Sequence, residues 1–432
     1  MLPLRRSLFL VLLSLAGLSS LSFGQATMQR QQRLNAILAT PITGPDLAAM
    51  TGLNLVGEIP GLAISLQQPL GMDPELFQRI LSVLDDSSLT TIAEPDPRVM
   101  VPESDGCAFT GQVGVQQCTI GFVSGGGVGE PCEGVNLASN FGLGPIIQTE
   151  LTMQPVVAVL DSGIEPNLPT ISNALLNPGF DHVLDQAGGF EMANGEDEDN
   201  DGLIDEALGH GTHVATTILS LSPDALILPL RVVDAEGIGF GFDVAEGILT
   251  AITEGVDMIN LSLSMNQPSE LVNLLITLAL SNGIEVYAAA GNTGSEGVLF
   301  PASFSGSSTS NAMIPANMPN AVIGVAAVNS DFARSSFSSF GDEVDLCGLG
   351  TRVCAMIPTG ELQAWQGTSM ACATATGVAA LLRSRLPAKF VQPIGELMIE
   401  TAQSVDAENP DMAGLLGAGA FDAQAAFAAA QR

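Results

Sequence analysis

Residues 225–264 read ALILPLRVVDAEGIGFGFDVAEGILTAITEGVDMINLSLS, and this stretch decides the fold class. It opens with a continuous apolar run (225–233), continues with apolar residues at helical spacing (243–255), and closes with a second apolar run (256–264). Short continuous apolar runs are typical of strands that are buried on both faces, as in parallel sheets covered by helices. We therefore predict a strand–helix–strand unit of a parallel sheet.

The same alternation extends over most of the chain on both sides of this unit. Further buried strands are predicted at 156–160, 284–291 and 320–328, and further helices at 212–221, 271–283 and 368–386. The predicted fold class is therefore α/β, with a doubly wound parallel sheet in a domain over residues 136–432. The apolar stretch 271–290 is interrupted by asparagines and by Glu285, so we interpret it as a core helix followed by a strand and not as a membrane span.

The N-terminal residues 1–26 have the composition of a secretory signal peptide. Arg5 and Arg6 precede an apolar run over 8–18, and small residues follow. The arginine pair leaves twin-arginine export open beside ordinary secretion. We expect a secreted or periplasmic protein that has no membrane anchor once this segment is removed.

Two further segments separate the leader from the α/β domain. Residues 27–103 contain a strand (61–67), a helix (74–86) and a returning strand (98–101), which predicts a small α+β domain. Residues 104–135 are rich in glycine and cysteine and are interpreted as a linker or an insertion.

Six cysteines in an exported chain predict disulfide bonds. Cys347 and Cys354 are close enough in sequence to close a small loop, and Cys372 lies in an apolar helical pattern that suits a buried free thiol. The other three are Cys107, Cys118 and Cys132. The sequence does not determine the pairing.

The charge balance argues against polyanionic partners. The chain has 46 acidic against 13 basic residues and a net charge of −33. A protein this acidic is repelled by nucleic acid and by anionic membrane surfaces, so we expect neither as a partner.

Three polar residues follow buried strands or begin helices. Asp161 directly follows the strand 156–160, His210 opens the helix around 212–221, and Ser369 lies at the start of the helix 368–386. Ligands of open parallel sheets bind at the carboxyl ends of the strands, so these side chains are expected to meet. An Asp that orients a His, and a His that takes the proton of a Ser, form a nucleophilic triad. Asn292, after the strand 284–291, and the free N–H groups at a helix N terminus are candidate donors to an oxyanion.

The segments VVAVLDSGI, GHGTHVA, AAAGN and GTSMA carry these residues, and their order and spacing resemble those of the subtilisin-like serine proteases. The resemblance covers residues 135–430. It implies a serine endopeptidase that cleaves protein or peptide substrates through an acyl-enzyme, with Asp161, His210 and Ser369 as the triad and Asn292 in the oxyanion hole. It also implies that substrate binds as an extended strand along two backbone edges. These edges are Ser262, Leu263 and Ser264 on one side and Ala289, Ala290 and Gly291 on the other.

The resemblance further implies that residues 27–103 are a propeptide. In the family such a segment assists folding, occupies the substrate groove and is removed by the enzyme itself. The chain also departs from the family: Cys372-Ala373-Thr374 replaces the usual Ser-Pro-His, and Ser264-Met265 stands in a segment that is usually rich in glycine. The second departure leaves the preference of the first specificity pocket open.

The acidic run DEDNDGLIDEALGHGTH (197–213) is interpreted as two neighbouring sites. Alternating aspartates followed by a glycine match the first half of an EF-hand-type calcium loop, although Leu208 stands where the closing Glu is required. Hard oxygen ligands suit calcium. The candidate ligands are Asp197, Asp199, Asp201, the Leu203 carbonyl, Asp205 and Glu206. The family resemblance assigns His210 to the triad, so we do not expect it to be a metal ligand.

Several alternatives remain open at this stage. The acidic run is otherwise a solvated loop, and residues 27–103 are otherwise a permanent accessory domain. A metallohydrolase would use His210, His213 and the acidic run, although His213 is better interpreted as a packed core histidine. A non-catalytic calcium-binding surface protein would use the acidic run alone. We expect the protein to be a monomer.

Overall fold

The computed structural model describes residues 33–38, 44–51, 53–59, 62–67, 74–85, 90–101, 130–132, 141, 143–195, 204–304, 322–387 and 390–431. They form two compact units, Met1–Pro97 with Ser269–Leu271 and Arg98–Pro268 with Val272–Arg432. The predicted signal peptide and most of residues 104–135 lie outside the described residues. Within these ranges, no helix combines the length and the hydropathy that a membrane span requires.

The smaller unit is a four-stranded antiparallel sheet with two helices. Its elements are β1 (Arg33–Leu38), α2 (Gly44–Thr51), β2 (Asn54–Ile59), β3 (Ala63–Gln67), α3 (Pro74–Asp85) and β4 (Thr90–Pro95), with strand order β2-β3-β1-β4. Ile80 and Leu84 lie one turn apart on α3 and are buried with Leu34, Ile64 and Leu66 of the sheet. The predicted strand 61–67 and helix 74–86 are therefore confirmed, each to within two residues.

The third predicted element of that region, the strand 98–101, has a different place. It forms β5 (Arg98–Met100), which lies in the larger unit between β11 (Ile238–Phe240) and β13 (Ser264–Met265). The strand that returns to the small sheet is β4. An apolar alternation indicates a strand but does not say which edge the strand pairs with, because every edge offers the same backbone groups.

The larger unit is built on an eight-stranded sheet whose core strands are parallel. The strand order is β16-β15-β14-β12-β7-β10-β8-β9. The bounds are β7 (Val156–Asp161), β8 (Phe180–Asp181), β9 (Gln186–Ala187), β10 (Leu226–Arg231), β12 (Met258–Leu261), β14 (Glu285–Ala289), β15 (Ile323–Val328) and β16 (Leu346–Leu349). Among these described strands, the short edge strand β9 alone runs antiparallel to its neighbour. The α/β prediction is confirmed.

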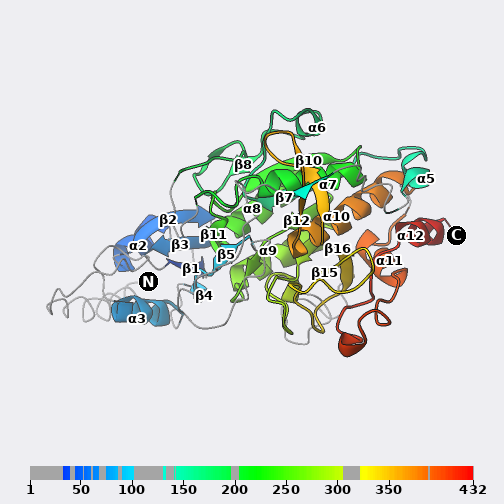
Figure 1. Cartoon of the computed structure of the whole chain (residues 1–432). Helices are drawn as coiled ribbons and strands as arrows, with labels where there is room; N and C mark the ends of the chain where they lie inside the picture. Colours follow the sequence, from blue (N-terminus) through cyan, green and yellow to red (C-terminus); the bar gives the residue numbers. More distant parts are fainter. Residues whose placement is uncertain are drawn as a thin grey trace. The chain divides into compact units, whose positions relative to one another are not determined.

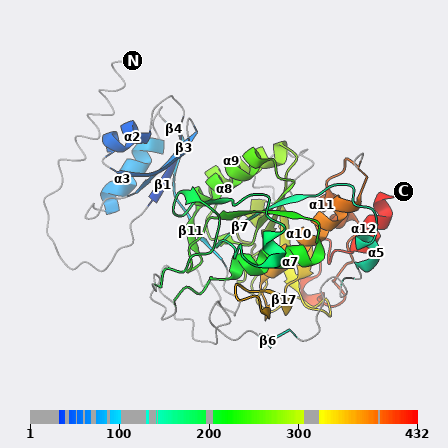
Figure 2. The same cartoon turned by 90° about the horizontal axis from the view of Figure 1, so that it is seen from above.

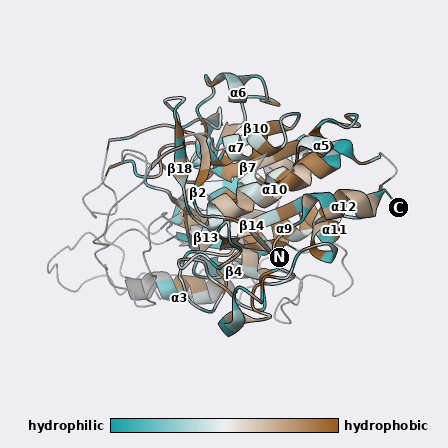
Figure 3. Ribbon diagram, turned by 45° about the vertical axis from the view of Figure 1, so that its right-hand side comes forward, coloured by the Kyte–Doolittle hydropathy of each residue, from teal (hydrophilic) through white to brown (hydrophobic). Residues whose placement is uncertain are grey.

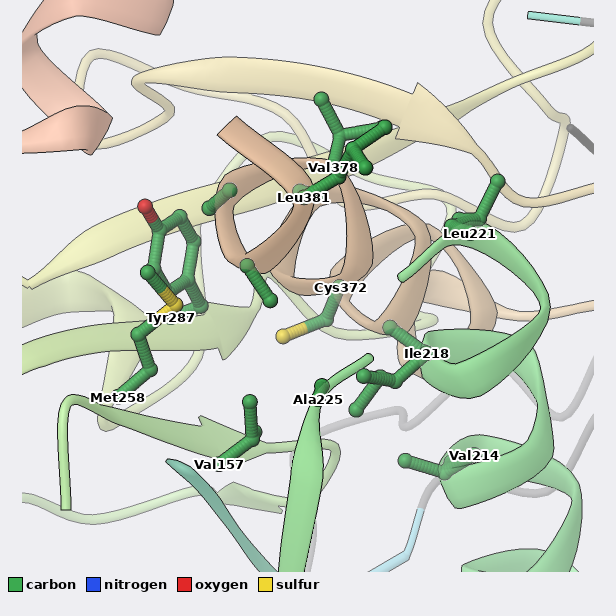
Figure 4. Packing of buried hydrophobic residues seen from close by; sticks show 14 of the residues in the cluster. Val157, Val214, Ile218, Leu221, Ala225, Met258, Tyr287, Cys372, Val378 and Leu381 are labelled. Atoms are coloured by element: carbon green, nitrogen blue, oxygen red, sulfur yellow. The ribbon is translucent and has the colours of Figure 1, made fainter. Parts of the chain in front are cut away.

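Helices cover both faces of this sheet, as the doubly wound prediction requires. α7 (His210–Leu221) and α10 (Thr368–Arg385) lie on one side, and α8 (Gly241–Glu254) and α9 (Glu270–Ser281) on the other (Figures 1 and 2). The hydrophobic residues follow the strands and helices of these layers, and the loops are more hydrophilic (Figure 3). A continuous core results, to which Val157 and Tyr287 of the sheet, Ile218 of α7 and Val378 of α10 all belong, and in which side chains pack on several sides of α10 (Figure 4).

A second small sheet, which sequence reasoning missed, packs against α7. It consists of β17 (Val353–Met356), β18 (Leu362–Trp365) and β6 (Glu130–Pro131), in the order β17-β18-β6. A disulfide joins Cys132, just after β6, to Cys354 of β17. The suggested loop closure between Cys347 and Cys354 is therefore wrong: Cys347 lies buried on β16, in another sheet, with a free thiol. Cys372 is a buried free thiol, as predicted.

The remaining elements are short. They are α5 (Gly144–Ile147), α6 (Pro169–Ser172), η1 (Ala302–Phe304), α11 (Ile394–Glu400), η2 (Pro410–Met412) and α12 (Ala423–Ala430).

Candidate active site

Asp161 is the last residue of β7, one of the innermost strands of the large sheet. β7 pairs with β10 on one side and with β12 on the other, so it is an inner strand. Its carboxyl end therefore lies in the middle of the row of strand ends where ligands of parallel sheets bind. The Asp161 side chain is fully buried. Its Oδ1 accepts hydrogen bonds from the Ser162 N–H (2.8 Å) and from His210 Nδ1 (2.7 Å).

His210 is the first residue of α7, and glycines on both sides let it approach Asp161. Gly209 precedes the helix in a left-handed conformation (φ 96°). A Cβ on Gly211 would lie 2.0 Å from the Gly163 carbonyl oxygen, so only glycine permits this contact between α7 and the turn after β7. His210 Nε2, on the other side of the ring, has no hydrogen-bond partner among the residues described.

Ser369 is the second residue of α10 and is held against the end of β12. Its Oγ donates a hydrogen bond to the Ser262 carbonyl oxygen (3.1 Å). Ser262 Oγ in turn donates to the Ser369 carbonyl oxygen (2.9 Å). The structure thus brings Asp161 and His210 into direct contact, while the Ser369 hydroxyl is bonded to Ser262 and not to His210.

Asn292 follows β14 and is oriented by Thr368. Its Oδ1 accepts hydrogen bonds from Thr368 N (3.0 Å) and Thr368 Oγ1 (2.9 Å). Its Nδ2 lies 3.4 Å from the position that a Cβ on Gly367 would take, and therefore close to the start of α10. The same Cβ position would lie 3.8 Å from the Ser369 backbone N, so the Asn292 amide and the Ser369 N–H lie on the same side of Gly367.

The residues predicted for the two substrate edges lie next to the ends of β12 and β14. Ser264 belongs to β13 and pairs with Met100 of β5, so this edge already holds an antiparallel strand. Ala289 ends β14; the Ala290 N–H donates to the Val325 carbonyl (3.0 Å), and the Gly291 carbonyl accepts the Ser339 N–H (2.9 Å). β11, which pairs with the other side of β5, was missed by sequence reasoning. The run GIG at 237–239 is the only local signal for it, since glycines allow close backbone approach.

His213 lies one turn beyond His210 and is fully buried. Its ring stacks on Trp365 of β18, with ring centroids 4.6 Å apart and an interplanar angle of 4°. Nε2 lies 3.1 Å from the Gln363 carbonyl oxygen. Burial lowers the pKa of His213 to about 3, with the neighbouring His210 contributing, so the ring is neutral and serves packing, as predicted.

The acidic run is described only in part. Asp197, Asp199, Asp201 and Leu203 lie outside the described residues. The Asp205 carboxylate accepts hydrogen bonds from the Asn194 N–H (2.8 Å) and the Gly195 N–H (3.0 Å), and Glu206 is buried. The portion of the chain that the structure describes contains no group of three or more acidic, histidine or cysteine side chains placed to hold a metal ion. The calcium prediction is therefore not tested.

The sequence model of the Subtilase family matches residues 153–419, which is more than half of the chain. The chain belongs to the subtilase family. This subtilase is 35% identical over 240 residues to subtilisin NAT of Bacillus subtilis subsp. natto, an alignment that covers 54% of the chain and 56% of the relative. It is 33% identical over 274 residues to the thermostable alkaline protease of Halalkalibacterium halodurans, covering 61% of the chain and 66% of the relative. The chain thus spans a little over half the length of the first of these relatives.

Solved structures share the fold at lower identity. Fervidolysin of Fervidobacterium pennivorans, described as a keratinolytic enzyme related to subtilisin, aligns with 95% of this subtilase and 62% of its own chain at a TM-score of 0.63 and 19% identity. A mutant form of the protease domain of PatA aligns with 66% of this chain and 98% of its own at a TM-score of 0.52 and 22% identity. At these identities the likeness concerns the fold alone.

Proposed function

We propose that this subtilase is a serine endopeptidase with Asp161, His210 and Ser369 as its triad. The observation that carries the proposal is the 2.7 Å hydrogen bond between Asp161 Oδ1 and His210 Nδ1, at the sheet edge where Ser369 lies in the first turn of α10. This bond fixes the tautomer of the imidazole and leaves Nε2 as the acceptor for a proton. Family membership supports the same assignment.

The chemistry begins with a rotation of the Ser369 side chain. Its hydroxyl moves from the Ser262 carbonyl to His210 Nε2, transfers its proton there and attacks the substrate carbonyl. Asn292 Nδ2 and the Ser369 N–H at the start of α10 then hold the developing oxyanion. His210 returns the proton to the leaving amine, and a water molecule activated by His210 hydrolyses the acyl-enzyme.

A metallohydrolase that uses His210 and His213 is not supported. His210 Nδ1 is bonded to Asp161, and His213 Nε2 lies against the Gln363 carbonyl with the ring stacked on Trp365. The two rings therefore have separate partners, and none of these contacts directs both toward one ion.

Expression of the chain beside its Ser369→Ala variant tests the proposed activity. We expect a fluorophosphonate probe to label the unaltered chain and not the variant, because only Ser369 is the nucleophile. Equal labelling of both chains, or of neither, would contradict the proposed role of Ser369.

We also propose that residues 27–103 act as a propeptide that the enzyme removes itself. β5 lies antiparallel between β11 and β13, like a bound substrate strand: Val99 faces Gly239 and Met265, and the Val101 N–H donates to the Gly237 carbonyl (2.9 Å). Met100 lies opposite Ser264 in this antiparallel pair. Continuing past Met100 therefore leads back along the other segment from Ser264 toward Ser262, which contacts Ser369. We therefore expect cleavage a few residues after Val101.

N-terminal sequencing of the mature protein tests this expectation. The new N terminus should fall among the first residues after Val101, and Ser369→Ala should keep its propeptide. A mature N terminus near residue 135, or processing of the variant by itself, would rule out the register of β5 as the guide to cleavage.

Two further properties follow from the sequence and have partial support. Secretion agrees with the proposed signal peptide at residues 1–26 and with the Cys132–Cys354 disulfide, since such bonds persist in oxidising compartments.

We propose a structural calcium ion held by the acidic run 197–206, whose C-terminal end is fixed where Asp205 binds two backbone N–H groups. A chelator should then lower the melting temperature of the Ser369→Ala chain, and an unchanged melting temperature would exclude the ion.

A further inference from the structure

α7, the helix that carries His210, begins without a cap of its own. Its N-cap residue is Gly209, which has no side chain, so the first N–H groups of the helix need partners from elsewhere. The Gly211 N–H donates to Ser162 Oγ (3.2 Å), and the Thr212 N–H donates to Glu191 Oε1 (3.1 Å). Both partners are therefore side chains from distant parts of the sequence.

Glu191 makes two hydrogen bonds to Thr212 in the first turn of α7. Its Oε1 accepts from the Thr212 N–H and also from the Thr212 hydroxyl, and Thr212 is fully buried. The same hydroxyl oxygen accepts the Glu165 N–H (2.8 Å). A carboxyl group at the N terminus of a helix is favourable because the free N–H groups and the helix dipole attract negative charge.

The backbone of Glu191 is itself tied to the turn that follows Asp161. The Glu191 N–H donates to the Ile164 carbonyl (3.1 Å), and the Ile164 N–H donates to the Gly189 carbonyl (3.2 Å). Ile164 follows Asp161 by three residues. Asp161 and His210 are therefore connected twice. They share a direct hydrogen bond, and they are also linked through the backbone of Ile164, the Ile164–Glu191 hydrogen bond and the contact of Glu191 with α7.

We propose that Glu191 is a positioning residue of the active site, which caps α7 and holds His210 at hydrogen-bond distance from Asp161. The inference rests on the proposed function. Glu191 touches no reacting atom, and its effect passes through Thr212 and the first turn of α7.

The charge of Glu191 adds a pH dependence to this role. Burial raises the pKa of Glu191 from its ordinary value of 4.5 to about 8; the Thr212 hydrogen bonds act against the rise, and the negative charges of Asp161 and Glu165 add to it. On α7 the titratable groups of the first turn are His210 and the neutral His213. Above about pH 8 the ionised carboxylate strengthens the cap and stabilises the positive charge that forms on His210 during reaction. We therefore expect kcat to rise through a step near pH 8.

The effect on stability has the opposite sign. The folded chain keeps a proton on Glu191 that the unfolded chain releases, so the free energy of unfolding falls as pH rises from 4.5 to about 8. A variant that cannot ionise at this position should lose less stability over that window. A purely structural role would change stability alone, whereas a positioning role also changes kcat.

Three variants test the proposal, each titrated with the fluorophosphonate probe so that kcat refers to active molecules. Glu191→Leu removes the acceptor and is expected to lower kcat by about 10- to 100-fold with KM within twofold, because a small displacement of His210 costs rate and not binding. Glu191→Gln keeps an acceptor for Thr212 but should lack the step near pH 8. Glu165→Gln is the matched control: it removes a neighbouring charge whose carboxylate binds Asn167 and not α7.

The outcomes separate this inference from the proposed function. If Glu191→Leu keeps kcat within twofold of the unaltered enzyme, or if Glu165→Gln loses as much, Glu191 is not a positioning residue. Should Glu191→Leu fail to fold, Glu191→Gln decides, since a pH profile identical to that of the unaltered enzyme overturns the inference. An unaltered chain that takes no probe refutes the proposed function instead. The melting curves of Ser369→Ala with and without Glu191→Gln, from pH 5 to 9, then still test whether Glu191 is protonated in the folded chain.

Discussion

Loss of the Cys132–Cys354 disulfide is expected to destabilise the larger unit substantially. The two cysteines are separated by 222 residues in sequence, so the bond closes a very long loop. The loop-entropy relation gives about 5 kcal/mol at 25 °C for a loop of this length, and native disulfides are typically worth about 2–5 kcal/mol. We therefore expect Cys132→Ser/Cys354→Ser to lower the free energy of unfolding by about 2–5 kcal/mol.

The loss should begin at the small sheet beside the active site. Without the bond, the backbone pairs of β6 with Gln363 and Ala364 are the described contacts that keep that segment on β18. β18 also supplies the Gln363 carbonyl that lies against His213 and the Trp365 ring that stacks on it. Since a two-residue strand is weak by itself, we expect β6 to detach first and the packing over α7 to loosen with it.

Urea unfolding of the Ser369→Ala chain measures this difference without self-digestion. Reductant should lower the unfolding midpoint of the parent chain toward that of the double variant. Reductant added to the double variant is the control, because any remaining change must come from the other cysteines. A difference below about 0.5 kcal/mol between parent and double variant would refute the loop-entropy argument for this bond.

Three further outcomes are expected. Asn292→Ala should lower kcat by about 100- to 1,000-fold at little change in KM, a size taken from measurements on subtilisin itself and not from this structure; kinetics with a peptide substrate check it. Arg231→Leu should cost about 3–5 kcal/mol in urea unfolding, because it leaves the fully buried Asp181 carboxylate without its ion-pair partner at 2.9 Å. Burial raises the pKa of Asp345 to about 7, so stability should fall as pH rises toward 7, and thermal melts of Asp345→Asn should show a flatter dependence.

Much of the fold was predictable because its signals are local. The apolar strands, the helical spacing and the polar residues that follow them require only the periods of the two regular structures. The predicted strand 156–160 and helix 368–386 agree with β7 and α10 to within one residue at either end. The placement of Asp161, His210 and Ser369 at one sheet edge follows from parallel topology alone.

Features that depend on contacts between distant segments were not predictable. Cys132 pairs with Cys354 and not with a cysteine near it in sequence. β5 pairs with β11 and β13 and not with the strands of the small sheet. Glu191 gave no signal as a cap, because the helix it caps begins 19 residues later. Each of these depends on which surfaces come together once the sheet has formed.

The sequence by itself therefore determined the α/β class, the order of the strands and helices along the chain, and the residue types that meet at the carboxyl edge of the sheet. The tertiary structure decided the strand order in space, the pairing of Cys132 with Cys354, the position of β5 between β11 and β13, and the side chains that bind the first N–H groups of α7. The reason is physical. Backbone periodicity depends on residues that are close in sequence, whereas hydrogen bonds and disulfides between distant segments depend on the packing of the whole core.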